Sequence, residues 1–323
     1  MNVMEKKMSY KIGSFNVQHL SSKDETVREK KFKDIAHIIR NQQFDIVALQ
    51  EVQNEESVKS LVNGLGNLKW DHVYMGPNTY ASKKEGYAYI WRNDRVRLVD
   101  DENGNPIIYD RYTKRHKIGT QGLVRPPLVA RFTPDDVNGG PFVEFRLINT
   151  HIAFSSSVNA IEAHNDSELR RMEYEILTKD VYRLISTMGT GNNMPSYTFL
   201  MGDYNLCLTS NNAPKIEDTI TISQGRTGDR NLITVQDRRT TVKQANENNK
   251  SKNAKELLEE DLYSNDFDHF TYDEIYPTIM KLENRRVDAL GTYYKNDVEN
   301  YRAYISDHVP IKLVIDLKNR ERG

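Results

Sequence analysis

Seven polar residues that could bind a metal ion or move protons lie at or just past the ends of short β-rich runs. They are Asn16, Glu51, His151, Asp203, Asn205, Asp307 and His308. Because strand ends in a sheet protein converge on one rim, we expect these side chains to cluster there. Carboxylates and amides suit a hard cation such as Mg²⁺, which keeps water and phosphate oxygens as further ligands. The imidazoles would then remain available for proton transfer, so the pattern predicts metal-assisted chemistry on a phosphate.

Each of these residues also has an ordinary structural explanation. Asn16 could be a turn or cap residue, and Glu51 could be the first acid of the following helix, favoured by the helix dipole. The GDYN segment 202–205 has the composition of a turn, His151 could be a core histidine with its hydrogen bonds satisfied, and the SDH segment 306–308 could be a loop. The hypothesis therefore depends on the residues jointly. The chain has no HExxH or CxxC spacing, which argues against the familiar zinc sites.

The composition predicts a folded globular protein without a global positive field. The 323 residues are 28% charged and 37% hydrophobic, enough for one large domain or two small ones. Lysine plus arginine (45) nearly balances aspartate plus glutamate (46), so any polyanion site must be local. A single cysteine, Cys207, excludes an internal disulfide framework, and the N-terminus lacks a secretory signal. We expect a cytoplasmic protein, and no apolar run approaches the roughly 20 residues of a membrane helix.

Strand and helix signals alternate through the N-terminal part, and short β-rich runs follow them. The expected strands cover residues 10–17, 45–52, 87–92, 96–100, 126–132, 142–154, 197–205, 286–294 and 308–317. Amphipathic stretches predict helices after the first two strands, the second ending near Gly64 and Gly66, and a long helix from Leu169 to Ile185. We expect an α/β fold in which two sheets pack face to face with helices outside.

The region from about 209 to 257 is polar and contains the runs QGRTGDR and QANENNKSKNAK. This composition predicts a long, partly ordered insertion instead of a separate domain. We therefore interpret residues 1–323 as a single domain that carries an insertion.

Seven motifs occur in an order that resembles the endonuclease/exonuclease/phosphatase superfamily. They are SFNVQ, LQEV, RPPLVARF, NTHIAF, MGDYN, RRVDAL and ISDHVPI. The resemblance spans nearly the whole chain, and the KEGYAYIWR segment at 84–92 together with Arg125 is similar to the DNase I-like branch. It implies a four-layer α-β-β-α sandwich whose two central, mainly antiparallel sheets carry the active site at one edge.

The resemblance also implies roles for individual residues. Glu51 would be the main metal ligand, with Asn16 and Asp307 near the same cation, which would be Mg²⁺ with Mn²⁺ or Ca²⁺ as alternatives. His308, oriented by Asp288, would polarise the attacking water.

On the opposite side of the phosphorus, His151 paired with Glu85 would support the phosphate or protonate the leaving oxygen. Asp203 would hold metal or the nucleophilic water, while Asn205 and Arg125 hold phosphate oxygens.

The resemblance implies a metal-dependent hydrolase, and we expect first a nuclease that contacts mainly the backbone phosphates of DNA or RNA. A small-molecule or lipid-headgroup phosphatase or phosphodiesterase of the same fold remains open, and so does a non-catalytic binding module. Gln53 stands where the DNase I pattern has a groove-entering arginine, and Lys83 replaces a groove-contacting tyrosine. Phosphate contacts could instead come from Lys83, Lys84, the RYTKRHK run at 111–117, or arginines at 226, 230, 238 and 239, although each could equally be solvated surface.

Overall fold

The fold was established from a computed structural model of the 323-residue chain. The structure describes residues 8–21, 25–66, 69–77, 85–101, 103, 108–109, 123–134, 143–153, 160–188, 194–208, 222–223, 229–235, 238–244 and 257–317. Every residue to which the family resemblance gave a role in metal binding, phosphate binding or catalysis lies within these ranges. Of the basic residues considered for phosphate contacts, Lys83, Lys84, 111–117 and Arg226 lie outside them.

The first sheet brings the two ends of the described chain together. Its strands run in the order β14-β15-β1-β2-β4-β3. They are β1 (Met8–Leu20), β2 (Ile46–Val52), β3 (Trp70–Met75), β4 (Gly86–Arg92), β14 (Met280–Arg286) and β15 (Ile311–Leu317). β1 and β2 are parallel and every other neighbouring pair is antiparallel, so a parallel pair lies at the centre of the sheet.

The second sheet has a similar plan. Its order is β12-β13-β9-β8-β7-β5, with β6 also paired to β7. The strands are β5 (Val96–Leu98), β6 (Ile108–Tyr109), β7 (Leu128–Pro134), β8 (Glu144–His151), β9 (Ser196–Asp203), β12 (Leu232–Val235) and β13 (Asp268–Asp273). The central strands β8 and β9 are parallel, whereas their neighbours are antiparallel. A short ribbon of β10 (Ile222–Ser223) and β11 (Asp229–Arg230) stands apart from both sheets.

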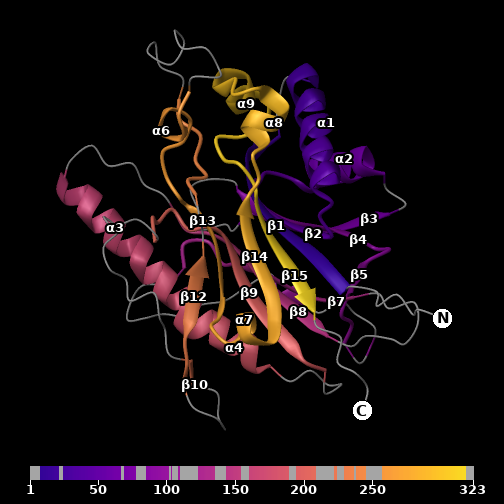
Figure 1. The fold of residues 1–323 in the computed structure, drawn as a ribbon, viewed down its shortest axis with the longest axis vertical. Coiled ribbons are helices and arrows are strands. Elements are labelled where there is room, and N and C mark those ends of the chain that lie inside the picture. The colour runs from indigo at the N-terminus through magenta and orange to yellow at the C-terminus, as the bar shows by residue number, and fades with distance from the viewer. Residues whose placement is uncertain are drawn as a thin grey trace.

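Helices cover the outer faces of the two sheets (Figure 1). The first sheet is covered by α1 (Glu25–Gln42), α2 (Glu55–Leu65), α8 (Ala289–Tyr294) and α9 (Val298–Tyr304). The second is covered by α3 (Ala160–Glu175), the π-helix η1 (Ile176–Tyr182) and α4 (Arg183–Thr187). Two short helices, α6 (Glu259–Leu262) and α7 (Tyr276–Ile279), flank β13 in the sequence.

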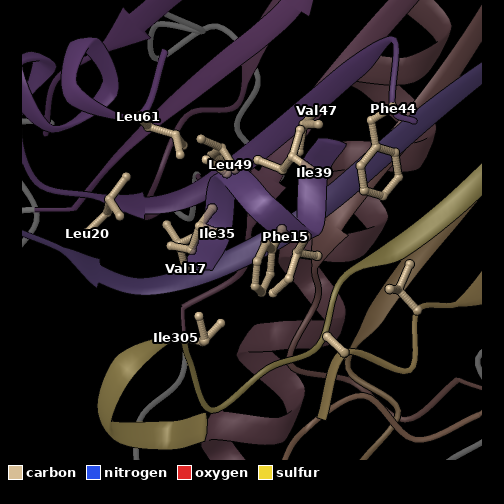
Figure 2. Packing of buried hydrophobic residues seen from close by; sticks show 14 of the residues in the cluster. Phe15, Val17, Leu20, Ile35, Ile39, Phe44, Val47, Leu49, Leu61 and Ile305 are labelled. Carbon is tan, nitrogen blue, oxygen red and sulfur yellow. The ribbon is translucent and has the colours of Figure 1, made fainter. Parts of the chain in front are cut away.

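Three apolar layers hold this stack together. Figure 2 shows the outer layer of the first sheet, where Phe15 and Leu49 of the strands meet Ile35 and Ile39 of α1. A second layer fills the space between the sheets, and a third joins the second sheet to α3 and η1. The predicted four-layer α-β-β-α sandwich with two central, mainly antiparallel sheets is therefore confirmed.

Helix α2 shows why the local sequence folds as predicted. The side chain of Asn54 accepts a hydrogen bond from the backbone N–H of Ser57, which satisfies one of the free donors at the helix start. Its apolar residues at Val58, Leu61 and Leu65 are buried on one face. The helix ends at Gly66, which takes φ +95°, a conformation that glycine adopts without steric cost. The predicted end of this helix is confirmed.

Other expected elements differ from the structure in detail. The segment expected as a strand at 286–294 is mostly helical, because β14 ends at Arg286 and α8 begins at Ala289. The helical stripe that was expected to be apolar leaves Leu169 and Leu184 exposed. Within the region 209–257, β12 joins the second sheet beside β13. No helix among the described residues is long and apolar enough to cross a membrane.

Candidate active site

The predicted polar residues meet where the central parallel strands of the two sheets end. In the second sheet, His151 at the end of β8 is the register partner of Asp203 at the end of β9. Asp268 at the start of β13 pairs with Asp203 from the other side. In the first sheet, the last part of β2 carries Glu51 beside the β1 segment that carries Asn16. The strand register therefore places His151, Asp203 and Asp268 together at one end of the second sheet.

Asn16 connects the two sheets at this rim. Its side-chain nitrogen donates to Glu51 Oε1 and to Asp203 Oδ2, both at 3.0 Å. Its side-chain oxygen accepts from the backbone N–H of Gln18 at 3.0 Å. A buried amide that donates to two carboxylates holds their negative charges close together. A site of this kind can attract a cation.

Two imidazoles approach the carboxylate of Asp203. Nε2 of His151 lies 3.6 Å from Asp203 Oδ2, and Nε2 of His308 lies 3.5 Å from the same oxygen. Asp203 is almost fully buried, and this burial raises its pKa to about 7 against the opposing effect of His308. Burial also lowers the pKa of His308, but Asp268 and Asp203 more than offset this and raise it well above its ordinary value. The rim can therefore hold and release protons near neutral pH.

The predicted partner of His308 is wrong. Nδ1 of His308 is 2.7 Å from Oδ2 of Asp268, whereas the side chain of Asp288 caps α8 by accepting from the backbone N–H of Gly291 at 3.1 Å. The physical reason is the register of β13, which brings its first residue beside the end of β9. A buried carboxylate behind a histidine fixes the ring and its tautomer, so Asp268 orients His308.

Glu85, Arg125 and His151 form the other side of the rim. Glu85 Oε2 forms an ion pair with an Arg125 guanidinium nitrogen at 2.7 Å and lies 3.8 Å from His151 Nδ1. Tyr87 fixes the strand end, because its hydroxyl oxygen accepts from the backbone N–H of His151 at 3.0 Å. The predicted neighbours are thus brought together, and Glu85 lies closer to the guanidinium than to the imidazole.

Beside this group lies Glu173 of α3, which sequence reasoning missed. Glu173 is 6% exposed, and burial raises its pKa to about 7 although Arg125 and the backbone N–H groups of Val124 and Ala153 oppose the shift. Its contacts join the segment before β7 to the segment after β8. Glu173 therefore supports the backbone just before Arg125 and just after β8. Only its place on the buried face of a long amphipathic helix could have indicated it.

Asn205 and Asp307 occupy the margins of the rim. The backbone N–H of Asn205 donates to Asp203 Oδ1 at 2.9 Å, and its side-chain nitrogen donates to the carbonyl of Ile152 at 2.8 Å. The backbone N–H of Asp307 donates to Gln18 Oε1 at 3.1 Å, and its carboxylate lies 3.7 Å from a guanidinium nitrogen of Arg302. Both residues lie beside the rim, as expected, and the carboxylate of Asp307 faces the guanidinium of Arg302.

Four residues around the rim have left-handed backbone conformations. Gln18, His19, Glu51 and Asn205 have φ between +40° and +60°. Residues other than glycine seldom adopt such angles, and they concentrate at functional sites. At Gly202 a side chain is excluded, since an added Cβ would lie 1.8 Å from the carbonyl oxygen of Thr150. The sequence gives no direct sign of these strained positions.

The strained part of β1 is a bulge that Lys31 of α1 holds in place. Pairing with β2 shifts register between Asn16 and Leu20, so the residues between them bulge out of the strand. Lys31 of α1 is 8% exposed and donates from Nζ to the carbonyl of Gln18 at 2.7 Å. Burial lowers the pKa of Lys31 to about 8, although Glu51 and Asp307 oppose the shift. The bulge turns His19 toward the site.

His19, Glu51 and Glu85 form a group of potential metal ligands that the sequence did not reveal. One ligand atom from each lies within 4.8 Å of the other two. The group combines two carboxylates with one imidazole, a donor set that binds divalent cations, so the residues fit the metal that the superfamily implies. The group includes Glu51 as predicted and does not include Asp307. A QH pair before Leu20 in an apolar strand is the signal that could have indicated His19.

A buried polar contact joins the sheets beneath this group. Gln50 of β2 donates from Nε2 to Asn149 Oδ1 at 2.7 Å and to Ser14 Oγ at 3.1 Å. Asn149 of β8 donates in return to the carbonyl of Leu49 at 3.0 Å. Hydrogen bonds between buried amides require one arrangement of the two strands. They therefore hold Glu51 and His151, which follow these residues, at a set separation.

Arg238 and Arg239, two of the basic residues considered for phosphate contacts, contact residues outside the rim. Arg238 and Arg239 are exposed; Arg238 lies 4.0 Å from Glu259, and Arg239 donates to the carbonyl of Tyr263. Gln53 is half-buried, and its carbonyl accepts from the hydroxyl of Tyr74 at 3.0 Å. Phosphate contacts by Arg238 and Arg239 are a proposal.

Comparison with known proteins agrees with this fold. A model of the Endonuclease/Exonuclease/phosphatase family matches residues 13–308, so the chain belongs to this family, whose members are hydrolases acting on phosphoric esters. A deoxyribonuclease from Thioalkalivibrio sp. (strain K90mix) is 34% identical over 95 residues, which cover 28% of this chain and 24% of that protein. The chain thus matches about a quarter of the length of that relative.

Solved structures with low sequence identity share the fold. An endonuclease/exonuclease/phosphatase family protein from Bacteroides thetaiotaomicron has a TM-score of 0.54 at 15% identity, covering 97% of this chain and 100% of that one. TDP2 from D. rerio, complexed with single strand DNA product, has a TM-score of 0.53 at 15% identity, covering 95% and 99%. These likenesses concern the fold of the chain.

Proposed function

We propose that this protein is a divalent-metal-dependent phosphodiesterase whose substrate is a nucleic acid. The observation that carries the proposal is the approach of two imidazoles to one buried carboxylate, within 3.6 Å on either side, beside the carboxylate of Glu51. In-line displacement at phosphorus needs proton acceptors and donors on opposite sides and positive charge near the nonbridging oxygens. The rim supplies residue types for both tasks.

Proton transfer is assigned to the group around Asp203. Asp203 has a pKa near 7, so its carboxylate can accept a proton from a water molecule at neutral pH. His308, held by Asp268, orients that water and stabilises the charge that develops. His151, next to Glu85, acts on the other side by supporting the phosphate or protonating the leaving oxygen. No covalent intermediate with the protein is required.

Phosphate binding is assigned to Arg125 and Asn205. The guanidinium of Arg125 is oriented by Glu85, and a charge-assisted bond to a phosphate oxygen would use its remaining N–H groups. Asn205 uses one side-chain hydrogen on the carbonyl of Ile152 and has a second for the phosphate.

The metal is assigned to Glu51, with Asn16 and Asp307 near the same cation or its waters. When bound, a divalent cation such as Mg²⁺ would supply positive charge to the nonbridging oxygens and favour ionisation of a nearby water. Asn16 keeps Glu51 and Asp203 within reach of one another through its two hydrogen bonds.

One finding favours a nucleic acid as substrate. The relative with 34% identity over the matched 95 residues is a deoxyribonuclease. The residues assigned here would contact phosphate and no base, which is compatible with recognition through a nucleic-acid backbone. The same set would also accept a single phosphate group of a small molecule or lipid headgroup. That class is the alternative outcome of the test below.

The test offers plasmid DNA, single- and double-stranded oligonucleotides, and RNA to the full-length protein with Mg²⁺ or Mn²⁺. Cleavage that EDTA abolishes and that His151→Ala strongly reduces would support the proposal. His72→Ala, which alters a histidine of β3 outside the rim, should cleave normally. Hydrolysis of inositol phosphates or sphingomyelin with all polynucleotides left intact would favour the alternative. The absence of both activities would overturn the proposed function.

A further inference from the structure

His19 lies where a ligand to the metal would lie. Its Nδ1 is 3.3 Å from Glu51 Oε2 and 4.0 Å from Glu85 Oε1. Ligands bound at about 2.2 Å are about 3 Å apart when adjacent and about 4.4 Å apart when opposite in octahedral coordination. The distances of 3.3 Å and 4.0 Å from His19 Nδ1 lie between these two values. The side chain is 51% exposed, so a cation could reach it from solvent.

The backbone is arranged to keep His19 there. Gln18 and His19 both have positive φ, and the carbonyl of Gln18 is held by Lys31. The backbone N–H of His19 also donates to Glu51 Oε2 at 3.2 Å. A surface histidine without a role does not require a strained bulge with a buried lysine behind it.

The third member of the group also has the required orientation. Glu85 Oε2 is engaged by Arg125 at 2.7 Å, while Oε1 is the atom nearest to the imidazole of His19. Glu85 is therefore placed between the phosphate-binding arginine and the metal ligands. Its side chain is 3% exposed, which restricts the carboxylate to this orientation.

We propose that His19 is a ligand of the metal, so that His19, Glu51 and Glu85 form a mixed nitrogen and oxygen site that favours first-row transition ions such as Mn²⁺ over Mg²⁺. This inference rests on the proposed metal-dependent function. Imidazole nitrogen suits transition ions, whereas Mg²⁺ prefers oxygen ligands and keeps several waters. The donor set would therefore make the ratio of the Mn²⁺ and Mg²⁺ affinities larger than carboxylates and amides alone would give.

The test measures metal binding directly on the full-length protein. Isothermal titration calorimetry gives the Mn²⁺ and Mg²⁺ affinities, and pulsed EPR of bound Mn²⁺ detects nitrogen coupling from a coordinated imidazole. His19→Asn removes the imidazole and keeps a residue that tolerates the positive φ at this position. We expect the Mn²⁺ affinity to fall by about tenfold or more, the Mg²⁺ affinity to change by less than about threefold, and the nitrogen coupling to disappear.

Two further variants complete the design. His19→Asp replaces the nitrogen by an oxygen at the same backbone angle, and should retain metal binding while lowering the preference for Mn²⁺. His72→Asn is the matched control, because His72 also lies near two carboxylates, with Nε2 3.6 Å from Glu55 and Nδ1 4.0 Å from Asp71. This control should leave both affinities and the nitrogen coupling unchanged.

Contrary outcomes separate the inference from the function on which it rests. Unchanged Mn²⁺ affinity and nitrogen coupling in His19→Asn would overturn the assignment of His19, whereas EDTA-sensitive cleavage by the same variant would leave the proposed function intact. If the wild-type protein bound neither ion and cleaved no phosphodiester, both would be overturned. A loss of substrate affinity alone in His19→Asn would also overturn the inference, since it would place His19 on the substrate.

Discussion

The two ends of strand β8 carry two buried charged groups with opposite properties. At its start, both oxygens of Glu144 are bonded to arginines: Arg131 at 2.8 and 2.6 Å, and Arg146 at 2.6 Å. Arg146 also donates to three backbone carbonyls at the end of α4, including that of Ile185. At the other end, His151 faces Asp203, whose pKa lies far above its ordinary range.

The difference shows how burial can serve stability or chemistry. At the Glu144 end, each charge meets an opposite charge or a helix carbonyl, so the group contributes to the stability of the fold. At the His151 end, carboxylates lie close to one another and to imidazoles, and the raised pKa of Asp203 lets it gain and lose a proton near neutral pH. Substitutions in the Glu144 group should therefore lower the stability of the fold, whereas substitutions in the His151 group should lower the catalytic rate.

The largest expected effect concerns activity. His308→Ala removes the imidazole that Asp268 orients, and should reduce the rate of phosphodiester cleavage by on the order of 10²–10⁴-fold. Thermal unfolding should change little, because Asp203, whose pKa is raised to about 7 by burial, can hold a proton once the imidazole is gone. Initial rates and a melting curve on the same preparation check both statements. If the variant melted far below the wild type, both ends of β8 would contribute to stability and the distinction between them would be lost.

The next effect concerns stability at the other end of β8. Glu144→Gln leaves two buried guanidinium groups without their shared carboxylate, and should lower the free energy of unfolding by about 3–5 kcal/mol. Urea unfolding followed by circular dichroism measures the loss. Cleavage per folded molecule should remain near the wild-type value. A fully stable but inactive Glu144→Gln protein would contradict the comparison.

A smaller effect should depend on pH. The pKa of Glu173 is raised to about 7, so the folded state holds its proton more tightly than the unfolded state, and stability falls as pH rises from about 4.5 to about 7. Glu173→Gln removes this dependence. The variant should match the wild type near pH 4.5 and exceed it at pH 8 by at most about 3 kcal/mol. Urea titrations at both values test this, and a pH-independent difference would refute it.

The smallest expected effect distinguishes Asp268, the observed partner of His308, from Asp288, the partner expected from the sequence. Asp268→Asn weakens the orientation of His308, and should lower kcat by about 10–100-fold while KM stays nearly constant. Asp288→Asn should alter helix α8 and leave both kinetic constants close to wild type. Steady-state kinetics on the two variants gives the answer. Equal losses of kcat would show that the histidine does not depend on its observed partner.

Much of the fold and rim could be predicted from the sequence because strand ends are local features. The apolar run before Glu51 and the strand before His151 each indicate a strand and its end. The sheet then determines where the side chains at these strand ends lie.

Partners supplied by register could not be predicted. Asp268 is one of several acids in the run NDFDHFTYDE, and only its pairing opposite Asp203 places it behind His308. Likewise, the bulge that turns His19 depends on Lys31 from a helix that packs behind the strand. Long-range packing decides both, and a single sequence does not display it.

The most direct measurement is diffraction from crystals grown with Mn²⁺ and a short phosphorothioate oligonucleotide that resists cleavage. We predict an anomalous Mn²⁺ peak against the carboxylate of Glu51 and a phosphorus atom between His151 and His308, beside Asp203. A cation bound away from Glu51, or a backbone phosphate outside the space between the two imidazoles, would contradict the assignment of this rim as the catalytic site.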